Sequence, residues 1–543
     1  MKKGNNINLS SEKADALFAP LLFLFVGYFL TIFFLGIYGD IIITSDASAD
    51  LILARLLNRD GGFLSKSFIY STELIVLDTQ FIFKPALALF PNDWHKARLL
   101  AHLVLMGIYL GTMIGLVKAS KLGPKGLWGV AFCAFPIGYY YTVNMSWSMF
   151  YTVNAAISFI MLTLLIVALR QKNKVPLFSI LLFIVSFISG VRTLRTIVQV
   201  NAPLILTALI MLACRKFKDL FKLSDSRVRD YDKNLTIYSF VMLFGACAGY
   251  VFNEVFLAKQ FVYTQYTTVG GHEFSIGKLL EALSDFIACY GWHPEVSLVS
   301  AAGISSALGL VLGALVVLAI VLLFFRFSDR LSDEEYLLVL FTLVTVVLCT
   351  FVISHINVCF PYHWVPVLPF GYLCLAIAIK HLSEAFKVFK KSRYGMFVGA
   401  FIFMVSLNWL LVPLSTVDEV RERQELISVA DELESKGYTR GMATFWNSNV
   451  VTELTDGRVE MWSVENFDSL QTFGWLQDIS HAQLPEGDVF LILTKEEYKT
   501  LSDDVKPYVT MERDYYCVLE FDDDDDYGAI LADAYIGGAQ DNA

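Results

Sequence analysis

Carboxylates and cations gather in one segment of the chain, between two long apolar runs. Asp40 and Asp46 follow the first run closely, and Arg98 lies where the second begins. The same kinds of side chain recur between them, at Asp50, Glu73 and Lys84. A carboxylate at such a place could accept the proton of an attacking hydroxyl group, while a lysine or arginine could neutralise a departing phosphate. These residue types predict group transfer from an anionic, lipid-borne substrate, because ionisable groups at membrane depth mark functional cavities.

Two further arginines extend the cationic set. Arg192 and Arg195 lie in a short connection between two apolar runs. The topology given below places this connection outside, where basic residues are disfavoured without another reason. A phosphate ligand is one such reason. Snorkelling to headgroups, or pairing with loop carboxylates such as Asp50 or Glu73, is an equally good explanation.

The elements that must position these residues are membrane-spanning helices. The chain has 543 residues, of which 56% are hydrophobic and 17% are charged, and its mean hydropathy is +0.55. These values exclude a soluble enzyme of this size. A helical span needs about 20 apolar residues, and runs of this kind predict eleven spans. They lie near 17–37, 97–117, 127–143, 150–169, 175–190, 197–214, 236–257, 297–325, 335–354, 364–380 and 395–414.

Basic residues predict on which side of the membrane each connection lies. Six clusters occupy every second connection and hold 23 of the 42 lysines and arginines. They fall at Lys2/Lys3/Lys13, Lys118/Lys121/Lys125, Arg170/Lys172/Lys174, Arg215–Lys233, Arg326/Arg330 and Lys380–Arg393. Short basic connections stay in the cytoplasm. We therefore expect a multi-pass protein of the plasma (inner) membrane, with a cytoplasmic N-terminus and an extracytoplasmic C-terminal domain.

Two domains are expected: a membrane domain at 1–414, whose first outside loop is 38–96, and a soluble domain at 415–543. The soluble tail has 29 acidic and 9 basic residues, hence a net charge of −20, which argues against nucleic-acid binding. Its pattern predicts a small α/β domain. Strands are expected at 442–446, 458–464, 489–494 and 516–521, and helices at 420–436 and 495–501.

Within the first outside loop, two segments have an interpretable pattern. Apolar spacing in 47–58 predicts an amphipathic helix that Ser45 or Asp46 could cap, so capping is the structural alternative for Asp46. The segment 71–85 is apolar but contains charged residues, and it is expected to lie along the membrane interface.

No cofactor is expected, and a divalent metal, although possible, is not indicated. The eight cysteines are scattered singly, which argues against disulfides and thiolate metal sites. The acidic run 522–526 is typical of a solvated loop more than of a Ca²⁺ site. His355 and His363 have no second ligand at a suitable spacing. The aromatic stretches 139–151 and 359–364 are typical of interfacial belts, with sugar-stacking platforms as the alternative.

The order of these features resembles the C-type glycosyltransferases, which share the GT-C fold. A long apolar span is followed by Asp40 and Asp46, interfacial helices, Lys84-Pro85, and Trp94–Arg98 at the entrance to the next span. The resemblance covers the first seven spans best. It implies an enzyme that takes sugar from a polyprenyl-phosphate carrier and uses an Asp or Glu of the first outside loop as general base. Asp46 is the position that the resemblance assigns, and Asp40 is the second choice.

Two stretches, 71–80 and 443–457, resemble bacterial members of this class. One departure concerns a late span, where such chains often show Arg-Tyr followed by proline. This chain has Tyr362-His363 and then Pro366, so no phosphate contact is assigned to Tyr362.

The sequence thus predicts a polytopic α-helical membrane protein of about 11 transmembrane helices, GT-C-like, with a small extracytoplasmic α/β domain. The favoured function is an inverting transfer, although the residues leave the stereochemical outcome, donor sugar and acceptor open. The expected partners are a polyprenyl-phosphate-linked sugar, an envelope glycan, lipid or protein acceptor, and the lipid bilayer. The cations expected around the phosphate are Lys84, Arg98, Arg192 and Arg195. A lipid-glycan flippase or a non-catalytic assembly subunit are the alternatives.

Overall fold

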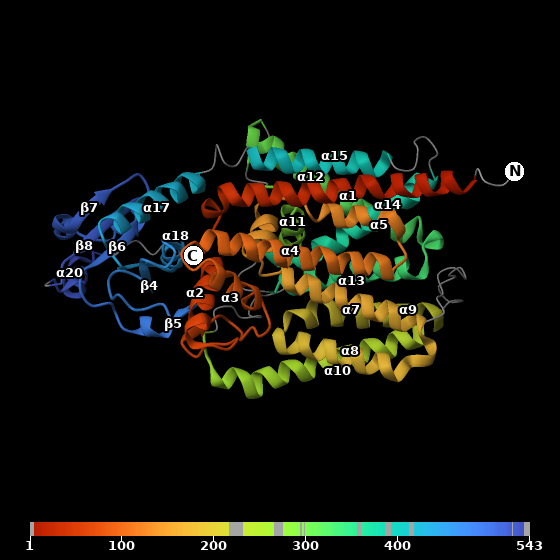
Figure 1. Ribbon diagram of the computed structural model, residues 1–543, viewed down its shortest axis with the longest axis horizontal. Helices are drawn as coiled ribbons and strands as arrows, with labels where there is room; N and C mark the ends of the chain where they lie inside the picture. Colours follow the sequence, from red (N-terminus) through yellow and green to blue (C-terminus); the bar gives the residue numbers. More distant parts are fainter. Residues whose placement is uncertain are drawn as a thin grey trace. The chain divides into compact units, whose positions relative to one another are not determined.

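The computed structural model describes residues 5–216, 232–264, 275–293, 296–297, 299–355, 360–385, 393–411, 418–523 and 525–536. The chain divides into two compact units (Figure 1). A helical unit comprises residues 1–34, 103–257 and 267–412, and a mixed unit comprises residues 35–102, 258–266 and 413–543. The mixed unit therefore combines the first outside loop with the tail.

The helical unit consists of helices that run largely side by side (Figure 1). Helices α1 and α4 begin or end in the mixed unit. The helices are α1 (Asn5–Tyr38), α4 (Trp94–Ala119), α5 (Gly123–Phe132), α6 (Tyr139–Tyr141), α7 (Thr152–Arg170), α8 (Val175–Arg192), α9 (Ala202–Lys216), α10 (Asp232–Phe252), α11 (Ile276–Ala288), α12 (Ala301–Phe325), α13 (Asp333–Ile353), α14 (Leu368–Ala385) and α15 (Arg393–Leu411). Short π-helical turns follow α6 and α10 and precede α9, and the 3₁₀ helix η9 (Pro361–Val367) leads into α14.

Among the described residues, ten helices are long and apolar enough to cross a membrane, and they coincide with ten of the eleven predicted spans. The remaining range, 127–143, holds the second half of the ten-residue α5, then α6 and the start of a π-helical turn. Even so, the chain in this range lies alongside α14. Lys125 lies 3.0 Å from Glu384 at the end of α14, and α6 packs against η9 at its start. This interrupted stretch therefore lies beside α14, from the end near Glu384 to the end near η9.

Connections predicted to be cytoplasmic meet at one end of the helical unit. Arg170 binds Glu334 at 2.6 Å, and Lys380 binds Glu335 at 2.6 Å. The acidic partners open α13, where a Ser332–Glu335 capping box starts the helix. Lys2, Lys3 and most of the clusters at 215–233 and 380–393 lie outside the described residues. The pairs show that several alternate connections share one end.

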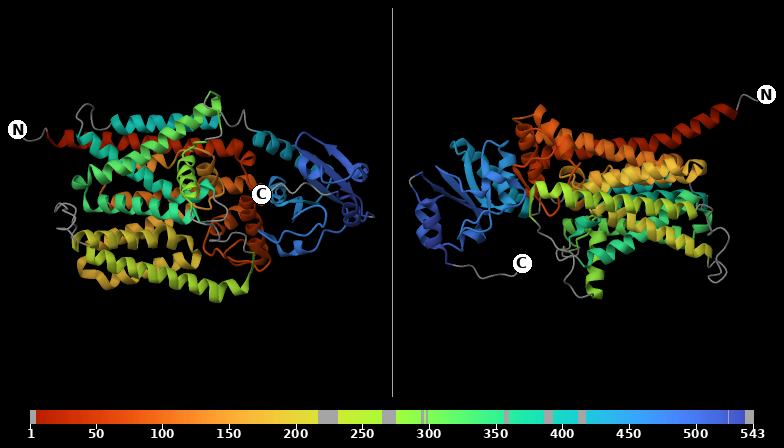
Figure 2. Two further views of the ribbon diagram at one scale, coloured as in Figure 1. Left: turned by 180° about the vertical axis from the view of Figure 1, so that it is seen from behind. Right: turned by 90° about the horizontal axis from the view of Figure 1, so that it is seen from below.

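Glycines let α8 and α10 approach closely. A Cβ atom at Gly249 would overlap Phe187 O, and one at Gly190 would overlap Ala246 O. Gly245 and Gly249 form a small-xxx-small pattern, which is common where membrane helices pack backbone to backbone. Figures 1 and 2 show the two helices lying side by side over most of their length.

The tail forms a five-stranded sheet in the order β4-β3-β6-β8-β7. Strands β3 (Arg440–Thr444), β4 (Glu460–Val464) and β6 (Val489–Thr494) are parallel, whereas β8 (Tyr516–Phe521) and β7 (Val509–Glu512) join antiparallel. Helices α17 (Asp418–Ser435), α18 (Phe445–Leu454), α19 (Lys495–Tyr498) and α20 (Tyr527–Ala534) complete it. Because both faces of β6 are buried, it is apolar almost throughout. The predicted α/β character of the tail is confirmed.

The first outside loop contributes α2 (Ser45–Asp60) and α3 (Gln80–Leu89) to the same unit. A second, three-stranded sheet joins three distant parts of the chain, in the order β2-β1-β5. Its strands are β1 (Phe68–Tyr70), β2 (Val262–Tyr263) and β5 (Gln477–Asp478). Both this sheet and the packing of α18 on α2 hold the loop against the tail.

Candidate functional site

Asp46 lies in the first turn of α2. The residue that caps this helix is Thr44, whose Oγ1 accepts from the Ala47 N–H at 3.3 Å. The expectation that Ser45 or Asp46 caps the helix is therefore wrong, because the helix begins earlier than its apolar pattern indicates. Asp46 follows the cap by two residues, at a helix N-terminus that favours negative charge, and one of its carboxylate oxygens is buried.

Asp50 lies one helical turn after Asp46, so the two carboxyl groups share a face of α2. The Thr79 hydroxyl donates to Asp50 Oδ1 at 3.1 Å. The other oxygen is buried, without a hydrogen-bond partner among the described residues. Burial, together with the nearby Asp78, raises the pKa of Asp50 to about 8. At neutral pH this carboxyl group therefore holds a proton and can donate a hydrogen bond.

Arg98 and Glu453 form a buried ion pair within the mixed unit. Arg98 Nε and Nη2 donate to Glu453 Oε1 and Oε2, each at 2.7 Å. The side chains are 0% and 4% exposed. Arg98 Nη2 also donates to the carbonyl of Ala47 at 2.9 Å, and the guanidinium lies 5.2 Å from the ring centre of Phe83. The structure thus gives Arg98, expected near a phosphate, partners within the protein.

Other tail residues bind the segments around α2. Asp456 Oδ1 accepts from the Trp94 N–H at 2.6 Å, at the start of α4. Arg55 Nη2 donates to Glu460 Oε1 at 2.6 Å. A hydrogen bond from His481 and the charge of Arg55 lower the pKa of Glu460 to about 2. These contacts attach the middle of α2 and the start of α4 to the tail.

The remaining expected residues of the loop lie at its edges. Asp40 Oδ1 and His95 Nδ1 are 2.7 Å apart, joining the end of α1 to the start of α4. Lys84, on α3, donates to Gly62 O at 2.6 Å and lies 5.5 Å from the ring centre of Phe63. Glu73 is partly buried between β1 and α3.

The two outer arginines belong to the helical unit and differ in exposure. Arg192, at the end of α8, is 1% exposed and donates to Asn154 Oδ1 on α7. Arg195 is exposed, with its guanidinium 5.5 Å from the ring centre of Tyr151. The aromatic stretches expected at this end include stacked Phe360 and Tyr362. A cation can bind a phosphate, and neighbouring aromatic rings can stack on the face of a sugar.

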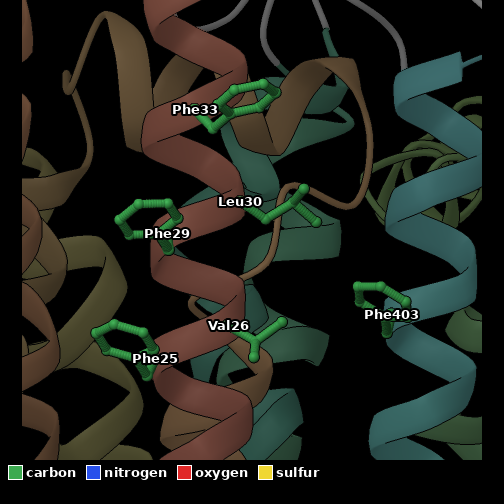
Figure 3. Close-up of a pocket in the computed structure, with 6 residues that line it drawn as sticks. All are labelled: Phe25, Val26, Phe29, Leu30, Phe33 and Phe403. Atoms are coloured by element: carbon green, nitrogen blue, oxygen red, sulfur yellow. The ribbon is translucent and has the colours of Figure 1, made fainter.

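An apolar groove also lies in the helical unit, between α1 and α15. It has a volume of about 300 Å³ and is lined by Phe25, Val26, Phe29, Leu30, Phe33 and Phe403. Figure 3 shows Val26 and Leu30 pointing across the space towards Phe403. All six residues that line the groove are apolar.

Sequence reasoning missed Thr79 and Glu453. Glu453 lies in the stretch 443–457, whose apolar start fits the strand predicted at 442–446. In the structure α18 begins at Phe445, directly after β3. No group of three or more His, Cys, Asp or Glu side chains in the described part of the chain is arranged to hold a metal ion.

No protein-family model and no curated protein matches the sequence. The structure, however, is similar to that of ArnT from Cupriavidus metallidurans, solved bound to undecaprenyl phosphate. The TM-score is 0.53 at 11% identity, and the match covers 92% of this chain and 97% of that one. The GT-C fold expected from the sequence, a multi-pass helical membrane protein with an α/β tail, is confirmed.

Proposed function

We propose that the protein is a membrane glycosyltransferase that moves a sugar from a polyprenyl-phosphate carrier to an envelope glycan, lipid or protein on the outer face of the membrane. The observation that carries the proposal is Asp46. Its carboxylate stands in the first turn of α2, just beyond α1, in a chain with the fold of ArnT. The carrier class is supported by the undecaprenyl phosphate bound in the ArnT structure.

Asp46 acts as general base in the proposed reaction. The acceptor oxygen attacks the anomeric carbon of the donor, and its proton passes to the Asp46 carboxylate. The bond from that carbon to the carrier phosphate breaks, and the phosphate leaves with the bonding electrons. A monophosphate carrier leaves as a stabilised anion, so a metal ion is not required.

The other groups are assigned by their charge and position. Lys84 is proposed to neutralise the leaving phosphate, and the exposed Arg195 is proposed as a second phosphate ligand. Arg192, also expected near the phosphate, is left out because its side chain is buried and already donates to Asn154 Oδ1. Protonated Asp50, together with Glu73, is proposed to bind substrate hydroxyls, and Asp40 is the second candidate for the base. Arg98 is left out of the phosphate set because Glu453 already engages its guanidinium with two hydrogen bonds.

The test is Asp46→Asn in the purified full-length protein, assayed with a panel of polyprenyl-phosphate sugars. Asn preserves the size of the side chain but cannot accept the proton, so turnover should fall by about 10² to 10⁴ while donor binding persists. Asp60→Asn, at the other end of α2, is the control and should keep full turnover.

Four other outcomes would redirect the proposal. Full turnover in Asp46→Asn with loss in Asp40→Asn would move the base to Asp40. Activity in both variants would contradict the mechanism. Carrier movement across vesicles without sugar transfer would favour a flippase, and envelope assembly without either activity would favour a non-catalytic subunit.

A further inference from the structure

Arg98 and Glu453 form a deeply buried ion pair next to the candidate site. Both side chains are almost fully buried, and the carboxylate meets the guanidinium through two parallel hydrogen bonds. Bidentate pairs of this kind fix orientation as well as contributing energy. Removing one partner leaves an uncompensated buried charge. The pair is therefore a rigid connection between α18 of the tail and the start of α4.

The connection continues from Arg98 to α2. Arg98 Nη2 donates to Ala47 O, the carbonyl directly after Asp46. A second contact reaches the same turn from the tail, because the Ser45 hydroxyl donates to the carbonyl of Phe445, the first residue of α18. The residues on both sides of Asp46 are thus held by groups that α18 supplies or orients.

We propose that Glu453 is a positioning residue for Asp46, acting through Arg98 and the Ala47 carbonyl. The acidic tail then contributes to the transfer site, because its helix α18 orients the carboxylate of Asp46. This inference rests on the proposed function, because it assigns Glu453 a task relative to Asp46 as the base. General-base catalysis needs the base within hydrogen-bond reach of the proton it accepts.

The charge on Glu453 has a second effect at the same face of α2. Burial and Asp78 raise the pKa of Asp50 most, Arg98 lowers it, and Glu453 raises it by a smaller amount. The negative charge of Glu453 therefore partly offsets the effect of the Arg98 guanidinium, which favours the ionised form of Asp50. The groups that face Asp50 are Asp78 and Thr79 ahead of α3, Arg98 on α4 and Glu453 on α18, with Asp46 one turn away on α2 itself.

The test combines kinetics with hydrogen–deuterium exchange on the full-length protein. Glu453→Gln removes the charge at almost constant size. If Asp46 is misdirected, kcat should fall by about 10- to 100-fold, the cost of a misplacement near 1 Å, while KM for the donor changes little. The amides of residues 44–50 should also exchange faster than in the unmodified protein.

The matched control is Glu434→Gln. Glu434 on α17 binds Arg458 in an ion pair wholly inside the tail, so kcat and the exchange of 44–50 should both stay unchanged. Arg98→Lys keeps the positive charge but loses the paired geometry, and its kcat should fall as in Glu453→Gln. Combining the two substitutions should lower kcat little further, because both act through one connection.

The outcomes separate the two proposals. Unchanged kcat and unchanged exchange in Glu453→Gln, beside an active parent, would overturn the positioning task. A parent that transfers no sugar would overturn the proposed function and with it the catalytic task, yet faster exchange in Glu453→Gln would still demonstrate the connection to α2. If Glu453→Gln does not fold, Glu453→Asp keeps the charge at a shorter reach, and unchanged kcat there would also count against the positioning task.

Discussion

At the scale of single residues, two carboxyl groups on one helix have opposite environments. Asp50 on α2 is held protonated by burial and by Asp78, with a pKa of about 8. Asp60, at the end of the same helix, has a lowered pKa because Arg59 and Ser65 donate hydrogen bonds to it. The same residue type can therefore serve as a hydrogen-bond donor in one place and an anion in the other.

These environments predict opposite pH responses. Because the pKa of Asp50 is higher in the folded than in the unfolded protein, its titration does not change the free energy of unfolding below about pH 4. As the pH rises from 4 towards 8, the same group progressively destabilises the folded protein. Asp50→Asn should match the parent protein near pH 4 and be more stable at pH 9, measured as the thermal unfolding midpoint in detergent. Asn can still accept from Thr79, so the hydrogen bond is kept.

Asp60→Asn is the matched control with the reverse sign. A lowered folded-state pKa contributes stability that is present above the unfolded pKa, near 4, and is lost as pH falls through the folded value. The variant should therefore be less stable than the parent at pH 7.

If the thermal unfolding midpoint of Asp50→Asn at pH 9 is no higher than that of the parent, the assigned protonation of Asp50 is wrong.

At the scale of elements, glycine placement decides how α8 and α10 pack. A Cβ atom at Gly249 would overlap the carbonyl oxygen of Phe187, whereas a Cβ atom at Gly107 on α4 would have no neighbouring atom within 4 Å. Backbone cannot move aside as a flexible side chain can. The two positions therefore form a matched pair on helices of the same unit.

Gly249→Ala should lower stability by about 1–3 kcal/mol, the usual cost of overpacking. Gly107→Ala should be neutral or slightly stabilising, because alanine favours helix over glycine. Thermal unfolding midpoints of the two variants, at constant detergent and pH, provide the measurement. A neutral Gly249→Ala would mean that α8 and α10 are not in backbone contact.

The elements also show what the sequence could predict. Strands such as β6 and β8 have apolar runs of strand length, and both lie at the predicted ranges, 489–494 and 516–521. The start of α18 could not be predicted in this way, because apolar residues at 442–446 fit a strand until tertiary packing turns the chain at Phe445. The pairing of Arg98 with Glu453 joins residues 355 positions apart, which no local pattern encodes.

At the scale of the whole molecule, the number of crossings decides which face of the membrane holds the tail. The described residues contain ten long apolar helices, an even number that alone would return the tail to the side of the N-terminus. The interrupted segment from α5 to α6 follows the length of α14, and counting it makes the number odd. The alternation of the basic clusters along the sequence predicts the odd number.

Labelling of introduced cysteines in intact cells distinguishes the two counts. Trp446, 60% exposed on α18, and the exposed Lys121, after α4, are suitable positions. With eleven crossings, a membrane-impermeant thiol reagent should label Trp446→Cys from outside, and Lys121→Cys only after the cells are opened. Labelling of both positions only after opening would show that α5 and α6 do not carry the chain across. The tail, with Glu453 and the rest of its contacts to α2, could then not serve a reaction on the outer face.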